Sequence, residues 1–428
     1  MRKVLFISHF FPPTGGAGVQ RSVKFVKYLP SLGYLPLVLT GAGRSPSKWT
    51  PEDESLTRDI PAEVPVFRAE KNAGTATNAA EVRHQALVAL GSQIIEREKP
   101  GLIFVTMSPF SDARVAAELA SRHGLPWVAD LRDPWALDEF QVFRTGFHRW
   151  QARLRMAQAL SSATSVIMNT PEATRYFRAQ FPALAGKAHV SITNGFDADD
   201  FAGVTRRAHT GTFTIVHSGY FHVELGLRQQ RRSLEYRILG RTEPGVAFLP
   251  RSHFYLLRAL EAWNKVAPQD AKRVRVVCLG VPSAVDQALV DQSPVREIFE
   301  FTGYLPHRDC VERVRNADLL FLPMHALPAG QRARLVPGKT YEYMAAARPI
   351  LAAVPAGDAR DFVEASGSAL VCDPVDWKAM QHLLAQQFRA WEQQRDLVQR
   401  RPGFLAQFER RQLSAQLAEE FTRIWPTQ

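Results

Sequence analysis

The sequence predicts an α/β protein with two doubly wound parallel sheets in tandem. Three observations lead to this fold class. Short, fully apolar runs alternate with segments of helical periodicity from the first residues onward, as expected for parallel sheets covered by helices on both faces. The same alternation restarts after a polar stretch at residues 203–211. The length of 428 residues suits two domains better than one.

Six predicted strands occupy the first half of the chain. They are the apolar runs Val4–Ser8, Leu35–Leu39, Leu102–Val105, Trp127–Asp130, Ser165–Met168 and His189–Ile192. Helical periodicity predicts helices near Val19–Leu32, Ala79–Glu98, Asp112–Arg122 and Phe147–Ser161. The apolar run at the N-terminus is too short for a signal peptide and leads into Pro12 and Pro13, so we interpret it as the first strand.

The second half of the chain repeats this arrangement. Its predicted strands are Phe213–His217, Val274–Leu279, Ile298–Thr302, Leu319–Leu322, Ile350–Ala353 and Ala369–Val371. Helices are expected at Ser252–Lys265 and Lys339–Ala347, and a helical pattern with no strand after it runs from Pro402 to Trp425. The arginine-rich segment Val223–Pro250 shows no clear period, and we interpret it as an insertion whose structure the sequence does not assign.

Composition limits the classes of binding partner and the cellular compartment that we expect. The net charge of +11 suits nucleic acid, an anionic membrane surface or phosphate-bearing small molecules. No lysine-rich tail or ribonucleoprotein signature occurs, so nucleic acid is the least favoured and we expect no such partner. The three cysteines form no CxxC pair or Cys/His cluster, so we expect no zinc site and no disulfide framework. No apolar run approaches the ~20 residues needed to cross a bilayer, and we expect a cytoplasmic protein.

Two loops carry the residue types of a phosphate site. Gly15 and Gly16 lie between the first strand and its helix, where glycines let the backbone approach an anion, although a plain tight turn explains them equally well. Gly338, Lys339, Thr340 and Glu342 open a predicted helix after an apolar strand. A lysine and free amides there suit a diphosphate, and a carboxylate one turn further suits a ribose or sugar diol. An isolated Lys–Glu surface pair is the alternative.

Five segments, in this order, resemble retaining glycosyltransferases of family four, which have the GT-B fold. They are FPPTGGAGVQR at 11–21, DLRDPW at 130–135, ITNGFDADDF at 192–201, FTGYLP at 301–306 and KTYEYMAAARPIL at 339–351. The resemblance implies two Rossmann-like domains that face a central cleft and a C-terminal helix that crosses back to the first domain. It implies an acceptor domain at 1–205, a nucleotide-sugar domain at 206–400 with an insertion at about 223–250, and the returning helix at 401–428.

The resemblance also implies roles for individual residues. Donor-binding positions would be Gly15, Gly16, Gly219, Arg251, Tyr304, Leu305, Gly338, Lys339, Thr340 and Glu342. Glu342 matches the second of two glutamates that many members carry eight positions apart, whereas Arg334 stands where the first would fall. The insertion leaves the basic residue for the diphosphate open, with Arg251 the first candidate and Arg228 the second.

Asp130 and Asp133 are the candidate catalytic residues, in the segment Trp127–Trp135 at the end of a predicted strand. Two carboxylates and Arg132 within four residues could orient an acceptor hydroxyl or balance positive charge on the reacting sugar. In the alternative, Asp133 caps the next turn and Arg132 pairs with it.

The sequence thus predicts a retaining glycosyltransferase that transfers a sugar from a nucleoside-diphosphate-sugar to an acceptor hydroxyl, without a cofactor or metal. The acceptor would be a glycan or lipid-linked molecule in cell-surface polysaccharide or glycolipid synthesis. The basic stretch Phe143–Arg155 contains aromatic residues and makes contact with an anionic membrane possible, although its apolar residues would equally cover a sheet. Two alternatives stay open: a nucleotide-sugar epimerase of the same fold, and a non-catalytic relative that binds carbohydrate or membrane.

Overall fold

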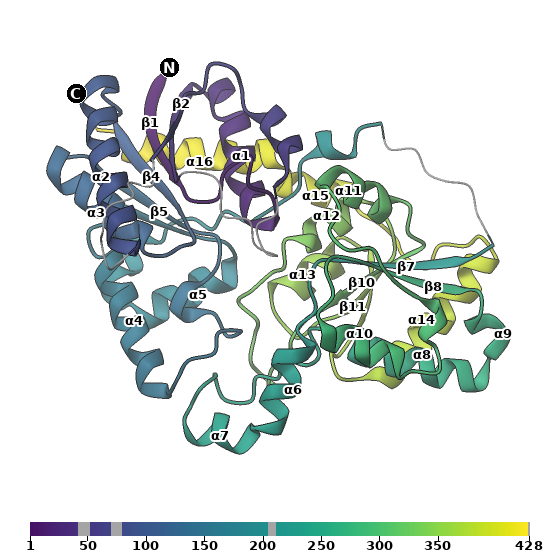
Figure 1. Cartoon of the computed structure of the whole chain (residues 1–428). Helices are drawn as coiled ribbons and strands as arrows, with labels where there is room; N and C mark the ends of the chain where they lie inside the picture. Colours follow the sequence, from purple (N-terminus) through teal and green to yellow (C-terminus); the bar gives the residue numbers. More distant parts are fainter. Residues whose placement is uncertain (42–51, 70–78, 204–210, 427–428) are drawn as a thin grey trace. The chain divides into compact units, whose positions relative to one another are not determined.

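The computed structural model describes residues 1–41, 52–69, 79–203 and 211–426, which fold into two compact units (Figure 1). The first unit comprises residues 1–138, 150–197 and 407–428, and the second comprises residues 139–149 and 198–406. Most of the polar stretch predicted to separate two domains, residues 204–210, lies outside the described residues.

The first unit is built on a six-stranded parallel sheet with the strand order β3-β2-β1-β4-β5-β6. Its strands are β1 (Arg2–Ser8), β2 (Tyr34–Thr40), β3 (Val66–Arg68), β4 (Leu102–Met107), β5 (Trp127–Leu131) and β6 (Ser165–Met168). Its helices are α1 (Ala17–Tyr28), α2 (Ala79–Glu98), α3 (Asp112–His123), α5 (Pro171–Gln180), α16 (Arg410–Ile424) and most of α4 (Gly146–Leu160). This is the doubly wound order of Rossmann-like folds.

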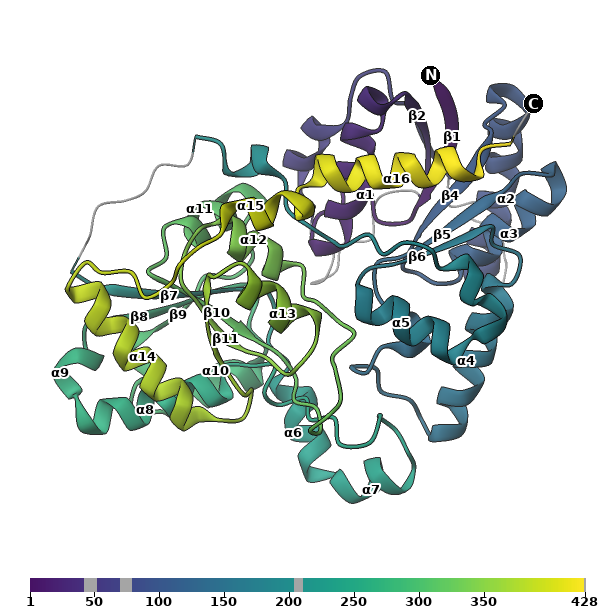
Figure 2. The same cartoon turned by 180° about the vertical axis from the view of Figure 1, so that it is seen from behind.

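Alternate residues of β1 enter two different cores, since successive side chains of a strand point to opposite faces. Leu5 and Ile7 pack with residues of α2 and α3. Val4 and Phe6 pack with residues of α1 and with Leu413, Leu417 and Phe421 of α16. The last helix of the chain therefore completes the core of the first unit, and it lies alongside α1 in Figures 1 and 2.

The second unit repeats the same topology, with the strand order β12-β11-β10-β7-β8-β9. Its strands are β7 (Phe213–Ser218), β8 (Val274–Leu279), β9 (Phe299–Phe301), β10 (Leu319–Pro323), β11 (Ile350–Ala353) and β12 (Ala369–Cys372). Its helices are α6 (Val223–Arg231), α7 (Ser233–Ile238), α8 (Phe254–Val266), α9 (Pro268–Ala271), α10 (Ala284–Asp291), α11 (His307–Arg315), α12 (Lys339–Ala345), α13 (Asp358–Ala365), α14 (Trp377–Glu392) and α15 (Pro402–Leu405). Residues of α8 and α14 share one core with the strands of this sheet.

These observations confirm the predicted fold class of two Rossmann-like α/β domains. One predicted strand is wrong, since residues 189–192 form only an isolated bridge between Ser191 and Met168. The hydrogen bond of this bridge runs from the N–H of Ile192 to the carbonyl oxygen of Met168. The short edge strand β3 was not predicted, since three half-buried residues give too little pattern. The unassigned insertion contains two helices, α6 and α7. Within the described part of the chain, no helix is long and apolar enough to span a bilayer.

Candidate functional site

The candidate site lies in the second unit, at the carboxyl ends of β7 and β10. These two strands lie side by side in the middle of the sheet, and the strand order runs outward from them in opposite directions. Ligands of doubly wound folds bind at such a switch point. Gly219 follows β7 with a φ of 101°, a backbone conformation that favours glycine. A Cβ built on Gly219 would lie 3.0 Å from Nζ of Lys339, so the absent side chain gives the lysine its place. The predicted donor residues Gly219 and Lys339 therefore meet in space.

Lys339 contacts a histidine of β7 rather than the glutamate one turn away. Its Nζ lies 3.1 Å from Nε2 of His217, while Nδ1 of His217 lies 3.0 Å from the carbonyl oxygen of Phe321. Nδ1 must donate to that carbonyl, which leaves Nε2 as an acceptor that faces the lysine. The alternative of an isolated Lys–Glu surface pair does not describe this geometry.

The charge of Lys339 is tuned by its surroundings. Burial, and next the positive charge of Arg251, lower the pKa of Lys339 to about 7. The pKa of His217 is also lowered, first by burial and then by Lys339, so His217 stays neutral as an acceptor. Glu342 acts in the opposite direction and raises the pKa of Lys339. Clustered groups with shifted pKa values are typical of functional sites.

Glu342 lies on the same helix, α12, and contacts a different histidine. Its Oε1 lies 3.0 Å from Nε2 of His307, the first residue of α11. Tyr343, the next residue, is buried and its hydroxyl accepts the backbone N–H of Ser218 at 2.7 Å. This bond joins α12 to the end of β7, immediately before Gly219.

The start of α12 contributes less than the sequence suggested. The helix has seven residues, and the amides of Thr340 and Tyr341 already donate to the carbonyls of Pro337 and Gly338. The side chain of Thr340 is buried and its Oγ1 has no hydrogen-bond partner among the described residues. Free helix amides are therefore a smaller part of this site than expected, and the charge of Lys339 a larger part.

Arg251 borders this group, as the sequence favoured. Its charge lowers the pKa of Lys339, and it is the second cause, after burial, of the fall in the pKa of His222 to about 3. Its guanidinium lies 4.5 Å from the ring centre of Phe140. The second candidate, Arg228, instead forms an exposed ion pair with Glu224 on α6.

Tyr304 and Leu305 lie in the loop between β9 and α11, just before His307. The side chain of Tyr304 is exposed, and the carbonyl oxygen of Leu305 lies 3.6 Å from Sγ of Cys310. Gly303 precedes them with a φ of 74° and forms an isolated bridge with Gly280, the residue after β8. A Cβ on Gly280 would lie 3.0 Å from the carbonyl oxygen of Gly219, so glycines keep three strand ends close together.

Arg334, at the position of the first family glutamate, belongs to a buried ion-pair cluster. Oε1 of Glu139 accepts the backbone N–H of Arg334 at 2.9 Å, and Oε2 accepts its Nε at 3.0 Å. Glu243, from the insertion, pairs with the same guanidinium. Arg334 thus connects the segment before α12 to Glu139 and to the insertion. At this position the chain offers no carboxylate that could bind the donor sugar.

The remaining predicted residues lie in the first unit, which is described by itself. Gly15 and Gly16 form the turn before α1, and Gly16 takes a φ of 90°. The carbonyl oxygen of Gly16 accepts the N–H of Val19, as a helix start requires. This geometry fits both the tight turn and the anion loop that the sequence suggested.

Asp130 and Asp133 have different surroundings. Asp130 is fully buried and both its oxygens accept from Arg21, at 2.6 and 2.9 Å. Arg21 also donates to the carbonyl oxygen of Thr193 at 2.6 Å, so this is an internal bridge between α1, β5 and a later loop. Asp133 has a half-exposed side chain, 3.9 Å from Nε of Arg132. A catalytic role for either residue stays a prediction, and Asp133 is the one that solvent reaches.

Three contact residues were not singled out from the sequence. His217 lies at the end of β7, the first strand of the second sheet, and this position was the available signal. His307 stands just after the matched segment FTGYLP. Nothing in the local pattern indicates Glu139, because its partners Arg334 and Leu335 lie 195 and 196 positions further along the chain.

Comparison with known proteins matches both halves of the chain to family models. Residues 15–195 match the family model of the glycosyl transferase 4-like domain, and residues 248–387 match that of glycosyl transferases group 1. The two models match the two units in the order of the chain. The chain belongs to this glycosyltransferase family. It is a glycosyltransferase of the GT-B type. No curated protein has a matching sequence.

Solved structures share the fold of this glycosyltransferase at low sequence identity. Anabaena Alr3699/HepE in complex with UDP-glucose has a TM-score of 0.62 and 16% identity, over 99% of this chain and 100% of that one. The lipopolysaccharide outer core galactosyltransferase WaaB has a TM-score of 0.59 and 12% identity, over 98% and 99%. The UDP-GlcNAc 2-epimerase from Methanocaldococcus jannaschii has a TM-score of 0.56 and 8% identity, over 98% and 99%.

Proposed function

We propose that this glycosyltransferase transfers a sugar, with retention of configuration, from a nucleoside-diphosphate-sugar to the hydroxyl of a glycan or lipid-linked acceptor. The observation that supports the donor most strongly is the group formed by Lys339, His217 and Arg251 at the end of β7, beside Glu342 on the same helix as Lys339. Positive charge there would neutralise a diphosphate, and the carboxylate would hold a diol.

In this proposal the chain's own cations stabilise the leaving diphosphate. Lys339 and Arg251 balance the charge that builds on the phosphate oxygens as the bond to the sugar breaks, which is transition-state stabilisation by fixed groups. The acceptor hydroxyl attacks on the face that the diphosphate leaves, and a departing phosphate oxygen takes its proton. Asp133 is the candidate to orient the acceptor.

The proposal includes no metal ion. Fixed cationic groups replace the divalent ion that other glycosyltransferases use to neutralise a diphosphate. The one Asp-x-Asp sequence, at 197–199, begins with a carboxylate that is already held by Lys24, Lys27 and the hydroxyl of Tyr28. Transfer should therefore proceed at an unchanged rate after treatment with EDTA, and a strict need for added Mg²⁺ or Mn²⁺ would contradict the mechanism.

The proposed acceptor class is a component of a cell-surface polysaccharide or glycolipid, reached by a cytoplasmic enzyme that associates peripherally with the membrane. Phe147, Trp150 and Leu154 lie on one side of α4 and are 62%, 55% and 49% exposed. They therefore do not cover the sheet, which was the alternative for this basic stretch. The buried residues of α4 are instead Met156 and Leu160.

The first experiment is a thermal-shift screen of the purified protein against a panel of nucleotide-sugars, followed by transfer assays with the stabilising donor. A donor that raises the melting temperature and is consumed only when an acceptor is present supports transfer. An epimerase of this fold would change the sugar with donor alone, and product analysis of that incubation separates the two activities. A protein that binds donor but neither transfers, hydrolyses nor epimerises it would be the non-catalytic relative.

A further inference from the structure

The insertion of the second unit carries aliphatic side chains that the unit leaves exposed. Residues 223–241, which we call the α6–α7 segment, contain Leu234, Ile238 and Leu239, with 60%, 71% and 40% of their surface exposed. Leu234 and Ile238 are four residues apart and so lie on one side of α7. Tyr236 on the other side is buried, with the guanidinium of Arg241 5.0 Å from its ring centre. The segment is thus anchored on one side and apolar on the other.

Arginines surround these aliphatic residues. The α6–α7 segment contains five arginines and two glutamates. Glu224 pairs with Arg228, and Glu235 pairs with both Arg232 and Arg241. Arg231 and Arg237 are exposed and have no acidic partner among the described residues. The segment therefore presents uncompensated positive charge next to exposed apolar surface.

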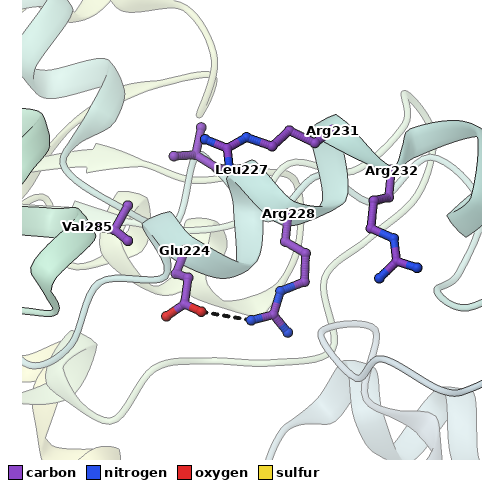
Figure 3. Close-up of a pocket in the computed structure, with 6 residues that line it drawn as sticks. All are labelled: Glu224, Leu227, Arg228, Arg231, Arg232 and Val285. Atoms are coloured by element: carbon purple, nitrogen blue, oxygen red, sulfur yellow. Dashed lines mark hydrogen bonds and ion pairs between the residues drawn. The ribbon is translucent and has the colours of Figure 1, made fainter.

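Figure 3 shows one side of this segment, where α6 borders a groove of about 430 Å³. Leu227 and Val285 line the groove together with Glu224 and three arginines. The side chains of Arg228 and Arg231 extend from α6 in different directions, and only Arg228 meets Glu224. Arginine side chains placed in this way can lie along an apolar layer while the charge reaches phosphate groups.

A second segment of the same unit extends this surface. The backbone N–H of Gly146 donates to the carbonyl oxygen of Leu239 at 2.7 Å, and that of Phe143 donates to Arg241 at 2.7 Å. A Cβ on Gly240 would lie 3.3 Å from Cα of Gly146, so paired glycines allow the close approach. Phe147, which is 62% exposed, directly follows Gly146 in the chain and therefore stands beside the end of the α6–α7 segment.

We propose that the α6–α7 segment, together with Phe147, binds the surface of an anionic lipid bilayer. Such a surface has acyl chains below a layer of anionic headgroups. The exposed aliphatic and aromatic side chains suit the acyl layer, and the flanking arginines suit the headgroups. A stable protein partner would need about 800 Å² of packed surface on each side, far more than a few separate aliphatic side chains supply. The inference extends the proposed function, since it holds the enzyme where a lipid-linked acceptor resides, but lipid binding is measured without turnover.

The test is flotation of the full-length protein with vesicles of phosphatidylcholine, with and without phosphatidylglycerol. The wild-type protein should float with anionic vesicles at about 0.05 M salt and be released at about 0.5 M. Two double variants, Arg231→Glu with Arg237→Glu and Leu234→Ser with Ile238→Ser, should each lower the bound fraction at least about tenfold. All four side chains are exposed, so both variants should keep the wild-type melting temperature.

The matched control is Lys265→Glu with Val266→Ser, an exposed basic and apolar pair at the end of α8 in the same unit. The control also replaces a basic side chain by glutamate and an aliphatic side chain by serine, but outside the α6–α7 segment, so it should float like the wild type. Absence of wild-type binding, or equal loss in the control, would overturn the inference. Donor binding, followed by thermal shift, is a separate readout: if it is lost while flotation persists, the proposed function fails and this inference stands.

Discussion

Glu139 and Arg334 are 195 positions apart in the sequence, and Glu139 holds both the backbone and the side chain of Arg334. One carboxylate oxygen also accepts the N–H of Leu335 at 3.3 Å. Burial opposes the charged form of Glu139, but His325 and Arg334 more than offset it and lower the pKa of Glu139. The carboxylate is therefore charged, and it fixes the backbone four residues before Gly338 and α12.

Replacing Glu139 by glutamine should destabilise the protein. The change leaves Arg334 buried with one carboxylate partner, Glu243, instead of two, and breaking such a pair costs about 3 kcal/mol. Because the pKa of Glu139 is lowered on folding, its contribution is present above about pH 4.3 and is lost as the pH falls toward the folded value. Urea unfolding at neutral pH and at pH 3–4 measures both effects.

The double variant Glu139→Leu with Arg334→Leu is the control for that experiment. The double change removes both charges of this pair together, so it should cost less than the sum of Glu139→Leu and Arg334→Leu made singly. Additive costs would show that the two side chains do not depend on each other.

Lys339→Ala should reduce turnover more than donor binding. The charge of Lys339 matters most as negative charge builds on the leaving diphosphate, so kcat should fall by about 10²-fold, as for other fixed donors to a developing anion. Steady-state kinetics with the identified donor give kcat and KM separately, and Lys265→Ala on α8 is the surface control. Unchanged kcat in Lys339→Ala would remove the main support for this donor site.

Donor affinity should depend on pH through the same lysine. Burial lowers the pKa of Lys339 to about 7, and a bound diphosphate should raise it again. Below pH 7 the lysine is already protonated, whereas above pH 7 binding must take up a proton, so affinity should weaken by up to about tenfold per pH unit. Calorimetric titration of the nucleoside diphosphate in buffers of different ionisation enthalpy counts the proton. The same proton uptake in Lys339→Ala would assign it to another group.

Glu342→Gln should mainly raise the KM for the donor. A carboxylate that holds a diol contributes similarly to the ground state and the transition state, so the loss of a charge-assisted bond of ~1.5–3 kcal/mol appears in KM. The variant should stay folded, because the isosteric amide can still bond His307. Glu224→Gln, which alters an exposed ion pair on α6, is the matched control. A fall in kcat with unchanged KM would argue that Glu342 acts in the chemical step instead.

The sequence predicted the sheets well and the contacts of the site only in part. Buried parallel strands such as β1 and β8 are almost continuously apolar, so local pattern is enough to find them. Lys339 and Glu342 were found because they stand three residues apart in one motif. Their histidine partners, His217 and His307, lie 122 and 35 positions earlier, and only the strand order brings them to the same sheet edge.

Asp130 shows the opposite limit of sequence reasoning. A carboxylate at the end of a strand predicts catalysis as readily as structure, and only the position of Arg21, 109 residues away, shows that both oxygens are bound. Local sequence reports the residue type, whereas the fold sets the partner that occupies the side chain.

The return of α16 to the first unit reverses the usual order of folding during synthesis. Domains generally fold as they leave the ribosome, with the N-terminal one first. Here α1 covers only part of one face of the first sheet, and the rest stays uncovered until Leu413, Leu417 and Phe421 have been made, while every strand of the second sheet is complete by residue 372. The nascent first unit therefore lacks the α16 contacts of apolar residues such as Phe104, which packs on Phe421, for most of translation, a period in which it depends on protection from aggregation.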